Sequence, residues 1–207
     1  MSLDRLSHDR YVIRKKFFKL FGEDFKVFDA DDNLVLFSKL KAFRLKEDIR
    51  LWADESMGEE LLSIQARGVI DFSMGYDVVD SQTGARVGVL KRKGFKSMLR
   101  DEWVVFDGDE QEIGLLREDS QIKALLRRVL GDLALIMPQK YHLEMGGGEH
   151  AGGTGGGPRV AEFTQGFNPF VQRLTLDFSP DTQGQLDPRL GIAAGVLIAA
   201  IEGRQGE

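Results

Sequence analysis

The chain contains no cysteine among its 207 residues, which excludes disulfide bonds, thiolate metal sites and cysteine nucleophiles together. It also has no long hydrophobic run: the longest stretch without a charge or strongly polar group covers twelve residues, 190–201. The first ten residues, MSLDRLSHDR, are polar and charged and do not resemble a signal peptide. We therefore expect a cytoplasmic protein, peripheral to a membrane at most, with no transmembrane segment.

Strong positive charge is also missing. The formal net charge of −5 argues against a nucleic-acid partner. The charges are nevertheless unevenly spread, with six basic and no acidic residues from Arg86 to Arg100, then eight acidic residues and one arginine from Asp101 to Asp119. This pattern indicates either a basic patch on an acidic protein or strand faces of opposite sign that are simply solvated.

A weak internal repeat organises the first half of the chain. Four segments (26–38, 50–65, 77–91 and 104–117) each consist of an apolar run, an aspartate, a short polar turn and a second apolar run. The aspartates are Asp29, Asp54, Asp80 and Asp107, spaced 25 to 27 residues apart. Aspartate, asparagine and glycine favour tight turns, so each segment is predicted to form a β-hairpin.

Further strands are expected at 141–145, 159–166 and 171–179, where Leu174, Leu176 and Phe178 alternate with polar residues. About ten to twelve strands result, and closure into an antiparallel barrel would remove their exposed edges. We expect a single barrel domain over residues 11–207 after a polar tail at 1–10. Two segments interrupt the β pattern: an amphipathic helix predicted at 120–132 and a glycine-rich loop at 146–157.

The apolar stretch near the C-terminus predicts a buried helix over residues 187–203. Asp187-Pro188 is a typical helix start, and Gly203 is a natural C-cap. Because twelve residues span only about 18 Å, the helix is too short to cross a bilayer and is expected to fill the barrel. The residues expected to pack against the barrel wall are the larger apolar ones: Leu190, Ile192, Val196, Leu197, Ile198 and Ile201.

In the order and spacing of these segments, the chain resembles the LURP-one-related family. This family belongs to the superfamily of tubby C-terminal domains and phospholipid scramblases. The resemblance covers residues 8–204 and is carried by segments 11–37, 91–107 (with Leu99, Arg100 and Trp103) and 187–202. It implies a mainly β, tubby C-terminal-like fold, a barrel of twelve strands around a central helix. It supplies no activity, since fold does not imply function.

The residues singled out for a binding function are five cations that could meet an anionic headgroup: Lys91, Arg92, Lys93, Lys96 and Arg100. Apolar residues between them could enter a membrane interface, and Arg14, Lys15, Lys16 and Lys19 could extend the patch. The alternative is the solvated face of an ordinary strand pair.

No recognisable catalytic, metal or cofactor motif accompanies this patch. Asp29, Asp31 and Asn33 match the first ligands of a calcium loop, but Leu34 and Leu40 occupy positions that such a loop reserves for glycine and glutamate. We therefore expect no cofactor and no metal. The leading hypothesis is a non-enzymatic module that binds anionic phospholipid headgroups or a protein partner on its outer surface. The alternative is a hydrolase or transferase with its site at a barrel mouth near the glycine-rich loop.

Overall fold

The computed structural model describes residues 3–18, 22–40, 48–67, 75–92, 102–119, 139–146, 156–166 and 171–202. Twelve antiparallel strands form one closed barrel in which each strand pairs with its neighbours in the chain, and β1 closes the ring on β12. The strands are β1 (Arg10–Phe18), β2 (Gly22–Phe28), β3 (Leu34–Leu40), β4 (Ile49–Trp52), β5 (Glu60–Ala66), β6 (Gly75–Asp80), β7 (Arg86–Arg92), β8 (Glu102–Asp107), β9 (Glu112–Glu118), β10 (Lys140–Met145), β11 (Arg159–Gly166) and β12 (Val171–Asp177). This confirms the predicted closed antiparallel barrel.

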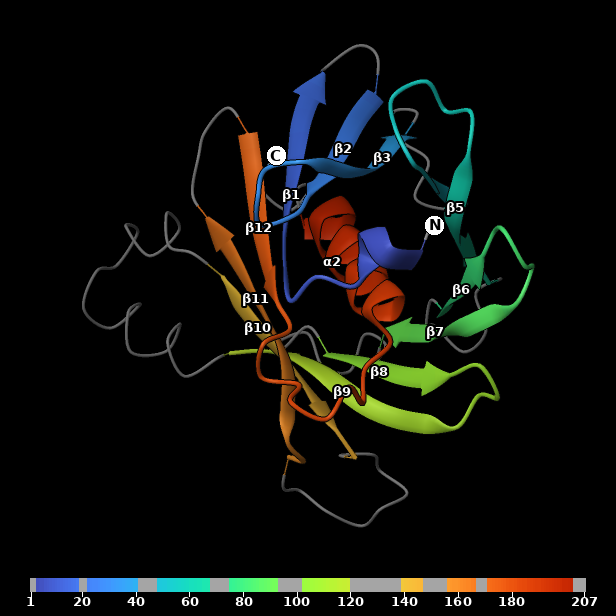
Figure 1. Cartoon of the computed structure of the whole chain (residues 1–207). Helices are drawn as coiled ribbons and strands as arrows, with labels where there is room; N and C mark the ends of the chain where they lie inside the picture. The colour runs from blue at the N-terminus through green and yellow to red at the C-terminus, as the bar shows by residue number, and fades with distance from the viewer. Residues whose placement is uncertain are drawn as a thin grey trace.

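A helix fills the barrel. Helix α2 (Pro188–Glu202) runs through the bore, and Figure 1 shows the strands arranged around it. It contacts β12, β1, β6 and β7, which lie on opposite sides of the ring. Five of the six predicted core residues, Leu190, Ile192, Val196, Leu197 and Ile198, are at most 2% exposed. Ile201 lies in the helix, but its side chain is outside the described residues.

Small residues let this helix approach the wall. A Cβ atom added to Gly195 would lie 2.8 Å from Leu176 and 3.1 Å from Ile13, and one added to Gly191 would lie 2.7 Å from Phe178. These two glycines, one turn apart, therefore form the face of α2 that packs against β12 and β1.

The alternation of side chains along the strands separates core from surface. On β1, Tyr11, Ile13 and Lys15 are at most 1% exposed and face the bore, whereas Arg14 lies on the outer wall. The stretch expected as a polar tail contains a short 3-10 helix, η1 (Leu3–Leu6), and its Leu6 packs into the core. The helix predicted at 120–132 and most of the glycine-rich loop (147–155) lie outside the described residues.

The antiparallel order gives the barrel two different mouths, because consecutive connections alternate between its ends. The turn mouth is the end where the turns beginning at Asp29, Asp54, Asp80 and Asp107 lie and where α2 begins. The helix-end mouth is the other end, where β1, β3, β5, β7, β9 and β11 finish and where α2 ends.

Candidate functional site: the basic end of the barrel

Four aspartates build the turn mouth in the same way, as the repeat predicted. The Oδ1 atom of Asp29 accepts hydrogen bonds from the amides of Asp31 and Asn33 at 2.9 and 2.8 Å. Asp107 does the same with Asp109 and Gln111 at 3.0 and 2.8 Å. Asp54 and Asp80 likewise accept the amide two residues ahead, at 2.8 and 2.9 Å. These carboxylates are engaged in holding tight turns.

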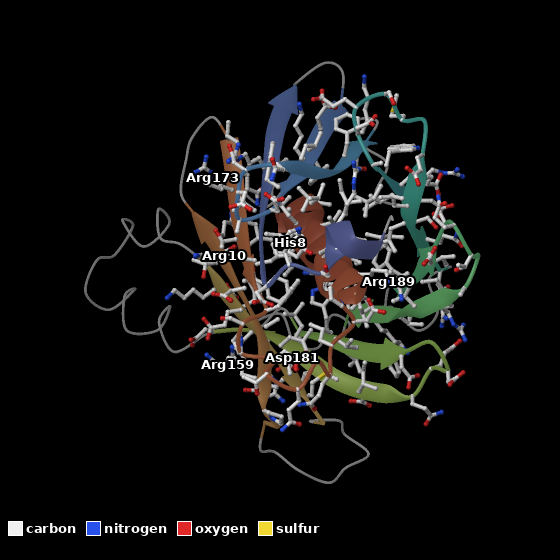
Figure 2. The ribbon with its side chains drawn as sticks, viewed as in Figure 1. His8, Arg10, Arg159, Arg173, Asp181 and Arg189 are labelled. Atoms are coloured by element: carbon white, nitrogen blue, oxygen red, sulfur yellow. The ribbon has the colours of Figure 1, made fainter. Side chains whose placement is uncertain are left out.

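One of these aspartates also anchors the helix. Oδ2 of the buried Asp80 lies 2.6 Å from Nη1 of Arg189, in the first turn of α2. Asp187 caps the helix by accepting the amide of Arg189 at 2.9 Å, and it also binds the Arg189 guanidinium at 2.6 Å. Figure 2 places Arg189 at this end of α2. In the part that the structure describes, the turn mouth is therefore held together by contacts among its own residues.

The segments that connect the strands differ in charge between the two mouths. The segments that join strand ends, or β12 to α2, at the turn mouth contain eleven acidic residues and neither lysine nor arginine. The acidic residues are Asp29, Asp31, Asp32, Asp54, Glu55, Glu59, Asp109, Glu110, Glu149, Asp181 and Asp187.

At the helix-end mouth, the segments that join strand ends contain eleven basic and six acidic residues. The basic residues are Lys19, Lys41, Arg44, Lys46, Arg67, Lys93, Lys96, Arg100, Lys123, Arg127 and Arg128. The acidic ones are Glu47, Asp48, Asp71, Asp101, Asp119 and Asp132. By sequence, the connections at the helix-end mouth are thus more basic than those at the turn mouth. Arg67 is the one cation among these eleven that the structure describes, and it binds Glu110 of the turn mouth.

Exposed cations on the strands lie near both mouths, and Arg10, Arg86 and Arg159 begin strands at the turn mouth. Lys39, Lys91, Lys140 and Arg173 are exposed near the helix-end mouth, and none of them forms an ion pair with another described residue. Figure 2 shows Arg173 on the outer wall of β12. These four side chains are therefore available to an external anion.

Of the five predicted headgroup-binding residues, the structure describes only the first two. Lys91 is exposed on the outer wall, whereas the neighbouring Arg92 is half-buried on the inner face at the end of β7. The two side chains therefore point to opposite faces of the strand. Lys93, Lys96 and Arg100 lie in the segment that follows, outside the described residues.

Lys15 is the largest departure from the sequence expectation. The sequence allows it to extend the surface patch, but its side chain is completely buried in the bore. Its Nζ donates to the carbonyl of Ala199, in the last turns of α2, at 3.1 Å, and it lies 5.4 Å from the centroid of the Phe25 ring. A cation at this position satisfies a free helix carbonyl and complements the helix dipole.

Other polar side chains share this end of the bore. Gln172 lies directly opposite Lys15 on β12 and is 6% exposed, yet neither atom of its amide has a hydrogen-bond partner. The Oε1 of Gln165 and the hydroxyls of Ser38 and Tyr76 are also buried without partners. Burial raises the pKa of Tyr76, and the nearby positive charge of Arg92 lowers it in part. The alternation of residues in the segment VQRLTLD could have predicted that Gln172 is buried, because Gln172 lies on the same face of the strand as Leu174 and Leu176.

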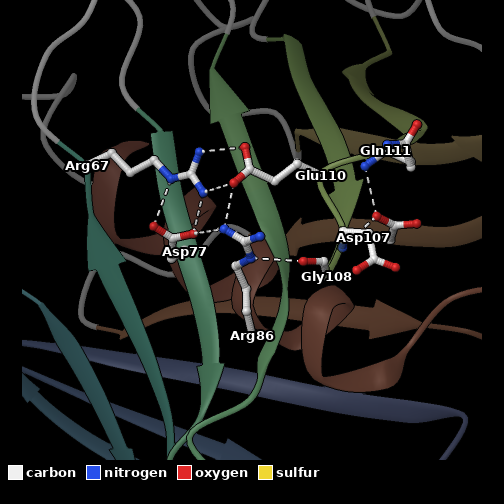
Figure 3. Close-up of polar contacts among 8 residues, drawn as sticks. Arg67, Asp77, Arg86, Asp107, Gly108, Glu110 and Gln111 are labelled. Atoms are coloured by element: carbon white, nitrogen blue, oxygen red, sulfur yellow. Dashed lines mark hydrogen bonds and ion pairs between the residues drawn. The ribbon is translucent and has the colours of Figure 1, made fainter.

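The outer wall carries a self-contained charge network (Figure 3). Arg67 binds Asp77 through two hydrogen bonds of 2.7 and 2.5 Å and Glu110 through two of 3.1 and 3.0 Å. Arg86 joins the same Glu110 at 2.6 Å and donates to the carbonyl of Gly108 at 2.9 Å. Its charges are mutually satisfied, so it links neighbouring hairpins and offers no free group to a ligand.

No arrangement typical of catalysis is found among the described residues. His142 lies on β10, 3.4 Å from Glu144. Burial, and then the charge of Arg159, lower the pKa of His142, while Glu144 and Asp119 act in the opposite direction. The described part of the chain contains no group of three His, Asp or Glu residues placed to hold a metal ion. In that same part, no helix has the length and hydrophobicity needed to cross a membrane.

Comparison with known proteins adds one structural likeness. No family model and no curated protein sequence matches the chain. An X-ray structure of a protein from Arabidopsis thaliana is similar over 99% of both chains, with 15% sequence identity and a TM-score of 0.46. A likeness of this degree carries no argument about function.

Proposed function

We propose that the protein is a non-enzymatic binding module whose helix-end mouth docks on an anionic surface, specifically the headgroups of anionic phospholipids. The observation that carries the proposal is the set of four exposed cations near this mouth, Lys39, Lys91, Lys140 and Arg173, beside connections that are basic in sequence. A flat anionic surface would attract these cations and repel the acidic connections of the turn mouth, so the field of the protein would orient it during approach.

The exposed cations supply the contact chemistry. Lys39, Lys91, Lys140 and Arg173 need not break an internal ion pair to bind a phosphate, and each cation near an anionic membrane contributes about 1 kcal/mol. Lys93, Lys96 and Arg100 follow Lys91 in the chain and belong to the same proposal. The resemblance to the LURP-one-related family, whose superfamily includes lipid-binding members, supports this choice. A cytoplasmic location at the membrane periphery is part of the proposal.

Vesicle co-sedimentation tests the proposal directly. The protein is mixed with phosphatidylcholine vesicles with and without phosphatidylserine, at low and high salt. We expect binding only to the anionic vesicles, and we expect it to weaken as salt screens the charges. Absence of binding to anionic vesicles at low salt would refute the proposal and would direct attention to a protein partner.

A pair of matched variants tests the orientation. Lys91→Glu/Lys140→Glu reverses two charges at the helix-end mouth, whereas Arg10→Glu/Arg159→Glu makes the same change in net charge at the turn mouth. We expect the first variant to bind anionic vesicles at least tenfold more weakly than the second. Equal losses would show that only net charge matters and would overturn docking through the helix-end mouth. No observation on the described residues favours the alternative of an enzyme.

A further inference from the structure

The junction between β3 and β4, which we call the seam, has the shortest ladder in the ring. Phe37 and Trp52 are the one residue pair in register across it. Four pairs join β4 to β5, and at least five join every other two neighbouring strands of the described barrel. Since ladder hydrogen bonds hold a barrel shut, the ring loses least by opening at the seam.

Charge opposes pairing at one end of the seam. Two positions beyond the Phe37–Trp52 pair, towards the helix-end mouth, β3 carries Lys39 and β4 carries Arg50, and both side chains are exposed. Like charges at opposed positions on neighbouring strands destabilise their pairing. Arg50 instead binds Glu60 on β5, at 3.0 Å. The register between β3 and β4 does not continue to the level of these cations.

At the turn mouth, the segment before β1 bridges the seam. We call this segment, residues 3–9, the strap. Its Arg5 donates from Nη1 to the carbonyl of Ala53, directly after β4, at 3.3 Å. Nε2 of His8 lies 3.9 Å from Oδ2 of Asp29, directly after β2. The strap is therefore attached on both sides of the seam.

One apolar side chain seats the strap. Leu6 is 4% exposed and belongs to the core cluster that contains the α2 side chains. In Figure 1 the blue N-terminal segment lies in front of α2. The carbonyl of Asp9 accepts the amide of Phe178, after β12, at 2.7 Å, so the strap is also joined to the far side of β1. Because its exposed polar contacts compete with water, the burial of Leu6 is what holds the strap in place.

We propose that the seam is a lateral opening built into the barrel and that the strap is the latch that holds it shut. When the strap lifts, β3 and β4 separate from the end with Lys39 and Arg50, and the eleven other junctions stay paired. This is local unfolding that breaks few ladder hydrogen bonds. It frees one edge of each strand, where an extended segment of another chain could pair. The inference does not depend on the proposed docking on membranes.

Hydrogen exchange of the whole protein, measured by mass spectrometry, tests the opening. In the wild type, we expect the amides of residues 34–40 and 49–52 to exchange at least tenfold faster than those of β8 and β9, which share five residue pairs. Equal protection would mean that the seam opens only when the whole barrel unfolds, and would overturn the inference.

A pair of matched variants tests the latch. Leu6→Ala should speed exchange in the seam at least a further tenfold and leave β8 and β9 within twofold of the wild type. Leu143→Ala deletes the same atoms from a fully buried position on β10, across the ring. It should speed exchange in β9 and not in the seam, because amides that exchange by local opening do not follow global stability. An unchanged seam in Leu6→Ala, or equal effects of the two variants, would contradict the latch.

A charge reversal should have the opposite effect. Lys39→Glu replaces repulsion across the seam by attraction to Arg50 and should slow exchange there at least threefold. Lys140→Glu makes the same change in net charge on β10 and should leave the seam as in the wild type. A seam that exchanges no more slowly in Lys39→Glu would contradict opening from this end. None of these measurements uses vesicles, so a failure of the docking proposal remains recognisable on its own.

Discussion

Arg189 and Asp80 are 109 residues apart in the chain, and their side chains meet at 2.6 Å where the central helix enters the barrel. Asp80 also accepts the amides of Gln82 and Thr83, so one carboxylate holds both the β6–β7 turn and the helix. The helix is therefore tied at its start by this ion pair and near its end by Lys15.

This relationship predicts strong coupling between the two residues. Asp80→Ala and Arg189→Met should each destabilise the protein by about 2–4 kcal/mol. The first removes the acceptor of the turn amides together with one of the two partners of Arg189, and the second leaves the buried Asp80 carboxylate without its cation. A double-mutant cycle by urea unfolding should give a coupling energy of about 1–3 kcal/mol. The half-exposed pair Arg159–Glu162 is the control and should give less than about 1 kcal/mol. Coupling no larger than in the control would contradict the anchoring role.

The contact between α2 and the wall predicts sensitivity to added volume. Gly195→Val should destabilise the protein by about 1–3 kcal/mol, because the new methyl groups meet Leu176 and Ile13. Gly166→Ala, whose Cβ would find its nearest neighbour at 3.8 Å, should change stability by less than about 0.5 kcal/mol. Chemical unfolding of both variants measures the difference. A stable Gly195→Val protein would mean that the helix can move away from β12.

The central helix should be indispensable for folding. Its five described large apolar residues each contribute about 1.5–3 kcal/mol when buried, which together rivals the stability of a typical domain. A chain truncated after Leu186 should be insoluble, or soluble without a cooperative melting transition in circular dichroism. A truncated barrel that melts cooperatively would disprove the core role of α2.

His142 should titrate below the ordinary histidine pKa of about 6.5. Because the unfolded chain takes up its proton at a higher pH than the folded protein does, the stability associated with neutral His142 is complete above about pH 6.5. It falls as the pH drops below that value. Arg159→Gln removes a positive charge and should raise the pKa of His142, and NMR titration of the imidazole would show both effects. A wild-type pKa above 6.5 would contradict the dominant effect of burial.

Much of the barrel was predictable from residue patterns. The four aspartates, spaced 25 to 27 residues apart, marked four hairpins at one end, and the charge-free segment at 190–201 marked the central helix. The pairing of β1 with β12 could not be derived from the pattern alone, since hydrophobic alternation identifies a strand but not the distant strand with which it pairs. The same limit applies to Arg189 and Asp80, whose pairing depends on the three-dimensional path of the helix.

The candidate site was predicted less completely. The basic segment after Arg86 was visible, but the charge division between the mouths depends on which connections share an end, which requires the strand order. The charge of Lys15 predicts a surface residue, because charged side chains are rarely buried, but Lys15 lies on the same strand face as Tyr11 and Ile13 and is inside the barrel. Predictions from residue type alone therefore place such buried polar residues on the surface.

The position of α2 after all twelve strands has a consequence for biosynthesis. As the chain leaves the ribosome, the strands emerge before the helix around which they pack, and β1 must await β12 before the ring can close. During that interval apolar strand faces and an unpaired edge are exposed, which is the condition under which nascent chains aggregate or bind chaperones. Folding of this protein is therefore expected to be slow and dominated by long-range contacts, and to be completed only after α2 has left the exit tunnel.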